Sequence, residues 1–424
     1  MSAPDWIIIG GYGLLVLLLG MMAGRRAQGE AEYFLAGRSL GWFPVAGSTW
    51  ATKLSALTFI GVPGAAIAQD FAFAQLWLGS FLAAYCVARL LIPEFYRLSV
   101  PTISTYLGLR IGPWTRSSAA VIFIISRCLA SAVRVAGCAI AVSVFFDLGL
   151  VEAIALIAGV AALYVLTGGL RAVIWTDMLQ LGLFLAGALA AIIFVGLKLP
   201  GGFAEIAQTG LAADKFKIFD LRFDIADPAT FWTGNIFALV LGLATGGADQ
   251  DIAQRALACR NEEQARTALI SAGAADLLST LLFLTAGVAV FAYYQAFPDA
   301  AVSALASEGR HDYVFPHFIR HELPAGLRGI LVAALLAAAM SSLDSALSGL
   351  ASSAYFDLGQ KDHHSKPSGS TWSRVLVIVF ALVLALIAIG FGTRRSGISA
   401  DSDGSSPSVS STILPQRSTQ SAQM

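Results

Sequence analysis

Long apolar runs separated by short polar loops account for most of the chain. Ten of them are long enough to cross a bilayer as helices, because a hydrocarbon core of about 30 Å needs roughly 20 mostly apolar residues. Apolar residues lie on all sides of each predicted helix, as contact with lipid or burial in a bundle requires. The predicted segments are 6–23, 42–68, 72–96, 117–146, 150–167, 170–197, 231–246, 267–297, 326–356 and 372–391. The pattern therefore predicts an all-α polytopic membrane protein.

The charges around these segments predict an orientation in the membrane. Asp5 precedes the first apolar run, whereas Arg25 and Arg26 follow it. This is the reverse of a secretory signal peptide, so we interpret the run as a retained helix with the N-terminus outside. The short loops 69–71 and 147–149, which this orientation places outside, contain no Lys or Arg, as the positive-inside rule requires.

The composition disfavours several other classes of protein. The chain has 424 residues, of which 57% are hydrophobic and 13% are charged. Soluble domains carry about 25% charged residues, so too few charges are available to cover such domains. Lys plus Arg and Asp plus Glu each number 27, which leaves no net positive charge for binding nucleic acid. The expected surroundings are the lipid bilayer, with no nucleic acid partner.

Neither the cysteines nor the histidines form a recognisable metal-binding or catalytic pattern. The four cysteines lie without a CxxC motif, and three of them lie within apolar runs. The five histidines are scattered over predicted loops, where histidines are usually solvated. Because the sequence contains no evident nucleophile–base pair either, it predicts a protein that is not an enzyme.

Seven charged residues lie more than three residues from the ends of the predicted membrane segments. Such residues are costly there and are functional candidates for that reason. Arg127 and Arg134 are seven residues apart on one helical face, where they either bond neighbouring carbonyls as packing residues or serve a function. Arg89 lies near a helix end and is expected to snorkel to the interface. The full set is Lys53, Arg89, Arg127, Arg134, Asp177, Asp276 and Asp344.

The second and ninth segments contain residues that suit a cation site. Hydroxyl and small residues fill the middle of the second segment, and Gly61 and Pro63 follow. A helix unwound there would free backbone carbonyls, whereas a merely kinked helix would not. In the ninth segment, Ala338, Ser341 and Ser342 share one face of one turn. Their oxygens could bind a small cation, although the packing of a Ser-rich helix explains the same pattern.

Five sequence motifs resemble those of the sodium/solute symporter family, which includes sodium-coupled sugar, proline and carboxylate transporters. The motifs are 33–41, 55–61, 167–177 with Gln180, 249–255 and 340–345. They follow the family's order, and the resemblance extends from about residue 31 to about residue 357. It implies a leucine-transporter-like fold, in which five helices are repeated in inverted orientation after an extra N-terminal helix.

The resemblance also implies a site for a co-transported sodium ion. Asp177 matches an acidic position that lies near this site in the family. Sodium would bridge the second segment to the ninth, and its release inside would favour the inward-open state. The implied ligands are the backbone carbonyls of Ala51, Leu54 and Ala338 and the hydroxyls of Ser341 and Ser342.

Lys53 departs from the family pattern, because relatives often carry a neutral or acidic residue at this position between two implied ligands. Three interpretations stay open: an ion pair with Asp177 or Asp344, a contact with a substrate carboxylate, or snorkelling. Thr58 and Gln75 are further candidates for the wall of a substrate cavity. They do not form the set of amides and carboxylates that suits a sugar, which weakly favours small carboxylates or similar solutes.

The C-terminal region also departs from the family. Residues 392–424 are rich in Ser with Asp, Pro, Gln and Gly, which predicts a disordered tail after a transporter domain at 1–391. The family has a helix there that closes the second repeat. The second repeat is therefore expected to be incomplete in this chain.

Together these features predict a multi-pass inner-membrane symporter that imports a small organic solute with sodium by alternating access. The alternative is a non-transporting membrane protein, either a truncated symporter fragment or a sensor or receptor built on the same fold. The sequence leaves open the identity of the solute, sodium against proton coupling, and the oligomeric state.

Overall fold

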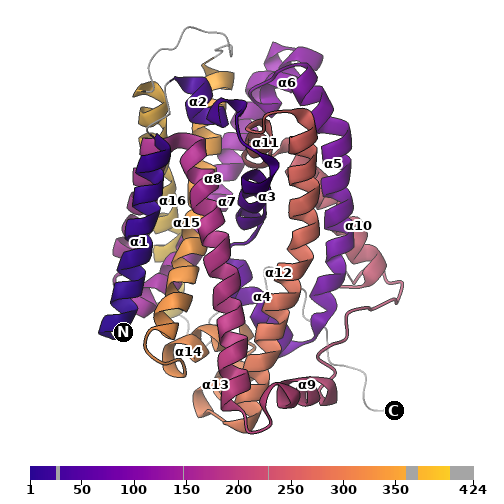
Figure 1. The fold of residues 1–424 in the computed structure, drawn as a ribbon, viewed down its shortest axis with the longest axis vertical. Coiled ribbons are helices and arrows are strands. Elements are labelled where there is room, and N and C mark those ends of the chain that lie inside the picture. Colours follow the sequence, from indigo (N-terminus) through magenta and orange to yellow (C-terminus); the bar gives the residue numbers. More distant parts are fainter. Residues whose placement is uncertain (25–28, 147, 228, 360–370, 402–424) are drawn as a thin grey trace.

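The apolar segments form helices that stand side by side in one bundle (Figure 1). The computed structural model describes residues 1–24, 29–146, 148–227, 229–359 and 371–401. Within these ranges the chain forms helices and one isolated bridge between Leu40 and Cys259, but no β-strand. The predicted all-α class is confirmed. The loop residues Arg25 and Arg26 fall outside the described ranges.

Eight of the described helices are long and apolar enough to cross a membrane, and α3 with α4 forms a ninth, bent span. The long helices are α1 (Ala3–Gly24), α5 (Trp77–Arg97), α7 (Pro113–Phe146), α8 (Leu150–Lys198), α10 (Phe231–Ala248), α12 (Glu262–Ala296), α15 (Leu327–Ser353) and α16 (Thr371–Asp401). The shorter ones are α2 (Glu30–Leu35), α3 (Trp42–Lys53), α4 (Ala56–Ala68), α6 (Ile103–Arg110), α9 (Gly202–Ala212), α11 (Gln250–Leu257), α13 (Ala300–Ser307) and α14 (Val314–His321). Single turns complete the set: η1 (Ala36–Arg38), η2 (Phe71–Leu76), η3 (His311–Tyr313) and the π-turn η4 (Ala354–Leu358).

Helix α8 contains two membrane crossings joined at Gly169. Its 49 residues would extend about 74 Å as a straight helix, more than twice the thickness of a bilayer core. Gly169 has φ 55° and ψ −150°, which breaks the helix. Tyr164 packs against Gly20 of α1, whereas Gln180 donates a hydrogen bond to the hydroxyl of Tyr12, two turns earlier in α1. The chain therefore reverses at Gly169, and the predicted segments 150–167 and 170–197 are its two arms.

The second predicted segment is a broken helix. The axes of α3 and α4 differ by 59°, and Leu54 between them has extended backbone angles. Helix α4 starts anew with its own capping box, in which the Ser55 side chain accepts from the Thr58 amide. Of the two interpretations of this segment, the structure adopts the unwound one.

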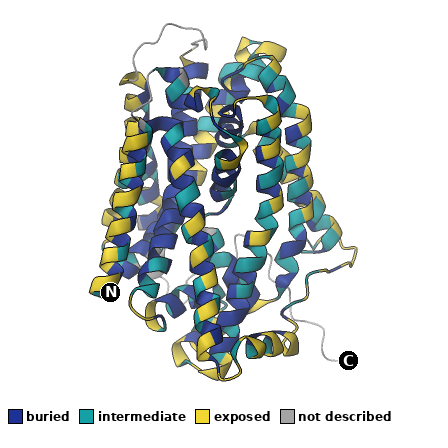
Figure 2. Ribbon diagram, in the orientation of Figure 1, coloured by how far each residue is buried: buried dark blue, intermediate teal, exposed yellow. Residues whose placement is uncertain are grey.

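Helix α15 lies at the centre of the bundle. In its most apolar stretch 94% of the residues are buried, compared with 6% in α10, which lies at the periphery (Figure 2). Small residues in α15, mostly Ala and Ser, allow α8, α7, α1 and α3 to pack closely around it.

The short helices gather at the two ends of the bundle. Helices α2, α6 and α11 lie at one end, and α9, α13 and α14 lie at the other (Figure 1). The first group belongs to the loops that the sequence predicts on the cytoplasmic side, and the second to those predicted outside. Helix α16 continues to Asp401, ten residues past the predicted end of the tenth segment at 391, and residues 402–424 lie outside the described ranges.

Candidate functional site

The break between α3 and α4 lies directly against the middle of α15. The hydroxyl of Ser341 is 3.5 Å from the carbonyl oxygen of Ala51, and the hydroxyls of Thr52 and Ser345 are 3.4 Å apart. The structure thus brings together the two segments that the sequence analysis linked. All five implied ligands are buried: Ala51, Leu54, Ala338, Ser341 and Ser342.

Several oxygens at this junction lack strong hydrogen-bond donors. The amide of Ser55 donates to the Thr58 hydroxyl at 3.3 Å instead of continuing the hydrogen-bond ladder of α3. This leaves the Ala51 carbonyl with only the long bond from Ser341 among the described residues. The hydroxyl oxygen of Ser342 is buried without any described hydrogen-bond partner. Because buried polar atoms are normally paired, and hard cations prefer oxygen ligands, this geometry is suited to a small cation.

A buried ion pair between Asp177 and Arg255 lies next to the junction. The Asp177 Oδ2 atom accepts hydrogen bonds from the Ser48 hydroxyl at 2.5 Å and from Arg255 Nη2 at 3.0 Å. Both charged side chains are fully buried. Arg255 also donates to Ser48 through Nε at 2.8 Å and to Ser345 through Nη2 at 2.5 Å. This network connects α3, the second arm of α8, α11 and α15 beside the proposed cation position.

The sequence analysis assigned no role to Arg255, which it included only within the family motif 249–255. The structure places Arg255 in α11, a short helix with Asp249 as its N-cap. The Arg255 side chain extends from this helix into the bundle, where it is fully buried. One signal was available: Arg255 is the single charge within the stretch 252–259, which otherwise consists of Ile, Ala, Gln, Leu and Cys. An isolated charge in such a stretch indicates a buried partner.

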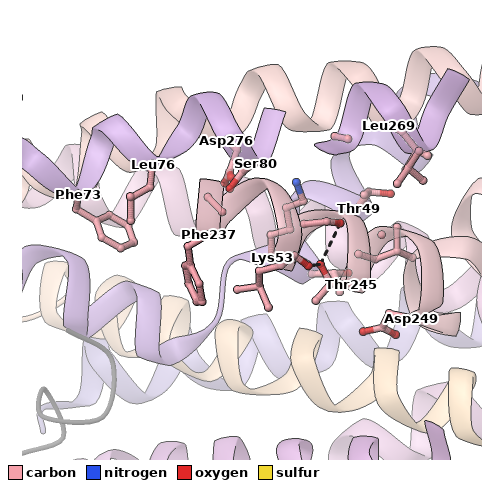
Figure 3. Close-up of a pocket in the computed structure, with 18 of the residues that line it drawn as sticks. Thr49, Lys53, Phe73, Leu76, Ser80, Phe237, Thr245, Asp249, Leu269 and Asp276 are labelled. Carbon is pink, nitrogen blue, oxygen red and sulfur yellow. Dashed lines mark hydrogen bonds between the residues drawn. The ribbon is translucent and has the colours of Figure 1, made fainter. Parts of the chain in front are cut away.

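Neither ion pair expected for Lys53 forms in the structure. Asp177 pairs with Arg255, and the Asp344 carboxylate accepts from the Tyr164 hydroxyl at 2.6 Å and from Ser345 at 3.2 Å. The physical reason is direction, because Lys53 is the last residue of α3 and its side chain leaves that helix towards the cavity and not towards Asp177 and Asp344. Its side chain lines a cavity instead (Figure 3).

This cavity has a volume of about 650 Å³ and lies between α3, α5, α7, α10 and α12. Apolar side chains make up much of its wall, with charged groups at several positions (Figure 3). The charged residues that line it are Lys53, Asp70, Arg127, Arg134, Asp249 and Asp276.

The arginines of α7 have acidic neighbours on α10 and α11. Arg127 forms an ion pair with Asp249 at 3.2 Å and a second one with Asp251. The expectation that Arg127 bonds neighbouring carbonyls is therefore replaced by an ion-pair cluster. Arg134, about two helical turns further along α7, interacts electrostatically with Arg127, Asp249 and Asp251.

Thr58 and Gln75 do not line the cavity. The Thr58 hydroxyl belongs to the capping box of α4. The Gln75 side chain holds the loop before α10, because its amide nitrogen donates to Ala229 O at 2.7 Å and its oxygen accepts from the Asp220 amide at 3.0 Å. Both residues therefore support local structure and do not contact a solute in the cavity.

Comparisons with known proteins agree with this architecture. A sodium/sialic acid symporter, SiaT of Proteus mirabilis, is 28% identical over 91% of this chain and 77% of its own length. The sodium-coupled monocarboxylate transporter 2 of Mus musculus is 26% identical, and the sodium/myo-inositol cotransporter 2 of Rattus norvegicus is 30% identical. Each covers 92% of this chain, which spans 63% and 61% of their lengths.

The fold and the sequence lead to one family. A solved structure of a Na⁺-coupled sialic acid symporter, in a substrate-bound outward-open state, matches with a TM-score of 0.84 and 28% identity. The match covers 92% of this chain and 82% of that one. The family model described as "Sodium:solute symporter family" matches residues 33–397. Because this match includes most of the chain and all the elements of the candidate site, the protein belongs to the sodium:solute symporter family.

Proposed function

We propose that this protein is a sodium-coupled symporter, which imports a small organic solute through the cell membrane by alternating access and has no enzymatic activity. Sodium is a transported ion in this proposal and moves down its gradient together with the solute. The observation that carries the proposal is the set of under-coordinated oxygens where the α3–α4 break meets α15. Relatives named for sodium-coupled transport of sialic acid, monocarboxylates and myo-inositol support the same class of function.

The proposed sodium site draws its ligands from two helices. Asp177 contributes negative charge near the site. Its Oδ2 atom accepts hydrogen bonds from Ser48 and Arg255, and its Oδ1 atom has no described hydrogen-bond partner. Carbonyl and hydroxyl oxygens without strong donors suit sodium, since hard cations bind oxygen. The proposed ligands are the carbonyls of Ala51, Leu54 and Ala338 and the hydroxyls of Ser341 and Ser342.

Sodium would strengthen a contact that is otherwise weak. The direct polar links across this junction, at 3.5 Å and 3.4 Å, are long for hydroxyl hydrogen bonds, which are typically about 2.7–2.8 Å. An ion bound to both helices favours the conformation in which they lie together. Its release into the cell favours a conformation in which they separate, and the solute leaves on that side.

Uptake into liposomes tests this proposal. The purified chain is reconstituted, a sodium gradient is imposed, and uptake is measured across a panel of labelled sugars, amino acids and carboxylates. The double variant Ser341→Ala with Ser342→Ala should raise the sodium concentration for half-maximal uptake by roughly tenfold to a hundredfold, since the loss of such polar partners costs about 1–3 kcal/mol. Ser352→Ala is the matched control, because Ser352 lies in the same helix with a buried hydroxyl that has no described partner.

The outcomes of this experiment differ clearly. An unchanged sodium concentration for half-maximal uptake in the double variant would contradict the proposed sodium site. Absence of uptake for every solute in the panel would contradict the transport function and favour a non-transporting protein.

We also propose that the N-terminus lies outside. The support comes from the positive-inside rule, since the short loops 69–71 and 147–149, which this orientation places outside, carry no Lys or Arg. A single cysteine introduced at Ser2 in a cysteine-free background should react with an impermeant maleimide in intact cells. Labelling only after permeabilisation would reverse the proposed orientation.

A further inference from the structure

Two charged residues on facing helices of the 650 Å³ cavity have no ion-pair partner. Lys53 ends α3 at the break, and Asp276 lies in the middle of α12. Among the described residues, neither forms an ion pair within 4 Å. Figure 3 shows the Lys53 ammonium on the side of the cavity where Asp276 lies. The two groups interact electrostatically without direct contact.

Three of the other four charges that line the cavity have partners within the protein. Arg127 pairs with Asp249 and with Asp251, whereas Arg134 interacts with these residues electrostatically and forms no described ion pair of its own. Asp70, at the rim, caps η2 by accepting from the Ala72 amide at 2.8 Å. Lys53 and Asp276 therefore remain available to a solute as two charges of opposite sign on facing helices.

The surroundings of this pair make an unpartnered charge expensive. Phe73, Leu76 and Phe237 stand on the wall nearby (Figure 3), so the local dielectric constant is low when a solute displaces the water. In such surroundings a charge is tolerated only with a partner and good hydrogen bonds. A solute that fills the cavity must therefore supply partners for both charges or bind weakly.

We propose that Lys53 and Asp276 form a two-ended site for a zwitterionic solute. The solute's carboxylate binds the Lys53 ammonium, its own ammonium group binds the Asp276 carboxylate, and its apolar body lies against the aromatic wall. This inference rests on the proposed transport function and names its substrate class. A simple anion satisfies Lys53 but leaves Asp276 buried and unpaired, and a polyol supplies no charge for either residue.

The site also lies close to the proposed sodium position. Lys53 stands between Ala51 and Leu54 in the chain, and the carbonyls of both belong to the proposed ligand set. A solute carboxylate held by Lys53 therefore constrains the same turn of backbone that sodium constrains. Binding of either one is expected to improve binding of the other, because coupling between two sites is reciprocal.

Thermal stabilisation of the purified full chain, measured in sodium, tests the substrate class. The probes are the neutral protein amino acids, γ-aminobutyrate and glycine betaine, each compared with its analogue lacking the ammonium group. Sialic acid, lactate and myo-inositol form the comparison set. Binding raises apparent stability by mass action, and the largest shift is expected from a zwitterion. A largest shift from an anion or a polyol, or no shift from any zwitterion, would overturn the inference.

Two variants then test the residues with the best zwitterion and its two single-charge analogues. Lys53→Gln should weaken zwitterion binding at least about tenfold while sparing the amine analogue, and Asp276→Asn should do the same while sparing the carboxylate analogue. A merely structural role would not produce this opposite selectivity. Lys53→Arg keeps the positive charge and should retain zwitterion binding. The controls are Lys198→Gln and Asp214→Asn, which remove exposed charges outside the cavity. Equal loss of all three ligands in both variants would contradict the assignment.

The failure of this inference differs from the failure of the proposed function. Sodium-stimulated uptake of an anion or polyol, without an effect of zwitterions, would overturn the inference alone. A zwitterion could instead bind in a way that depends on Lys53 and Asp276 while no solute shows sodium-stimulated uptake. That result would overturn the transport function but would still support the proposed binding site.

Discussion

Arg255 is the buried residue whose removal should have the largest effect on stability. Its guanidinium donates hydrogen bonds to Ser48, the Asp251 carbonyl, Asp177 and Ser345, at 2.5–3.0 Å. The two hydroxyls can find other partners, but Asp177 cannot, because it is fully buried and its second oxygen already lacks a donor. Arg255→Met therefore leaves an uncompensated carboxylate in the bundle. Breaking such a pair costs about 3–5 kcal/mol, a large part of a typical stability of about 5–15 kcal/mol.

A double-mutant cycle isolates this interaction. Asp177→Asn alone leaves the guanidinium without its counter-charge and should also destabilise the protein. The combined variant removes both charges, so its cost should be at least about 2 kcal/mol smaller than the sum of the single costs. Denaturant unfolding in mixed micelles, followed by tryptophan fluorescence, measures each free energy of unfolding. Strictly additive costs would refute the claim that the two charges depend on each other.

Arg266 supplies the matched control. It pairs with Glu262 one turn away, and the two side chains are 31% and 38% exposed. An ion pair of this kind contributes about 0–1 kcal/mol. Arg266→Met should thus change the free energy of unfolding by no more than that amount. If Arg255→Met had an equally small effect, burial would not be the source of the cost.

Three further predictions concern other parts of the molecule. Gly169→Ala should prevent accumulation of folded protein, because φ is positive there and an added Cβ would collide with the Tyr33 carbonyl. Gly182→Ala, which has open space around it, should be tolerated. Equal yields of the two variants in fluorescence-detected size exclusion would contradict this. Tyr164→Phe should lower the free energy of unfolding by about 1–3 kcal/mol, because it removes the 2.6 Å hydrogen bond to buried Asp344. Tyr85→Phe, on the exposed side of α5, is the control and should have little effect on the free energy of unfolding. Outside the membrane segments, the hydrogen bond with His317 lowers the pKa of Asp299. A carboxyl with a lowered pKa stabilises the folded state above its ordinary value of 3.8 and loses this effect as the pH falls through its folded-state pKa. Asp299→Asn should consequently lower the thermal midpoint at pH 7, and the difference should shrink as the pH falls below 3.8; a difference that grew in acid would contradict the sign.

The resemblance to the family implied that the α3–α4 break meets α15. The membrane segments and the break itself could be predicted from the residues alone. Each depends on local composition: a run of about 20 apolar residues predicts a crossing, and Gly, Pro and hydroxyl residues in such a run predict an interruption. The residues Ala338, Ser341 and Ser342 were found for the same reason, since one helical turn brings them to one face. Local rules of this kind need no knowledge of the neighbouring helices.

The partners of the buried charges could not be predicted in this way. Lys53 and Asp177 are both charged and both close to the junction, and the sequence offered them as a pair. The structure pairs Asp177 with Arg255, which is 78 positions away, and directs Lys53 to the cavity that contains Asp276. The choice depends on the directions in which side chains leave α3, α8 and α11, and those directions follow from the packing of whole helices.

The sequence by itself determined that the chain crosses a membrane many times, where its second segment breaks, and to which family it is related, because hydrophobic runs and short motifs are properties of consecutive residues. Only the tertiary structure decided that Arg255 enters the bundle and that Lys53 and Asp276 face one cavity. These facts join residues far apart in the chain, and the energy that selects them, the cost of burying a charge without a partner, exists only once the helices have packed.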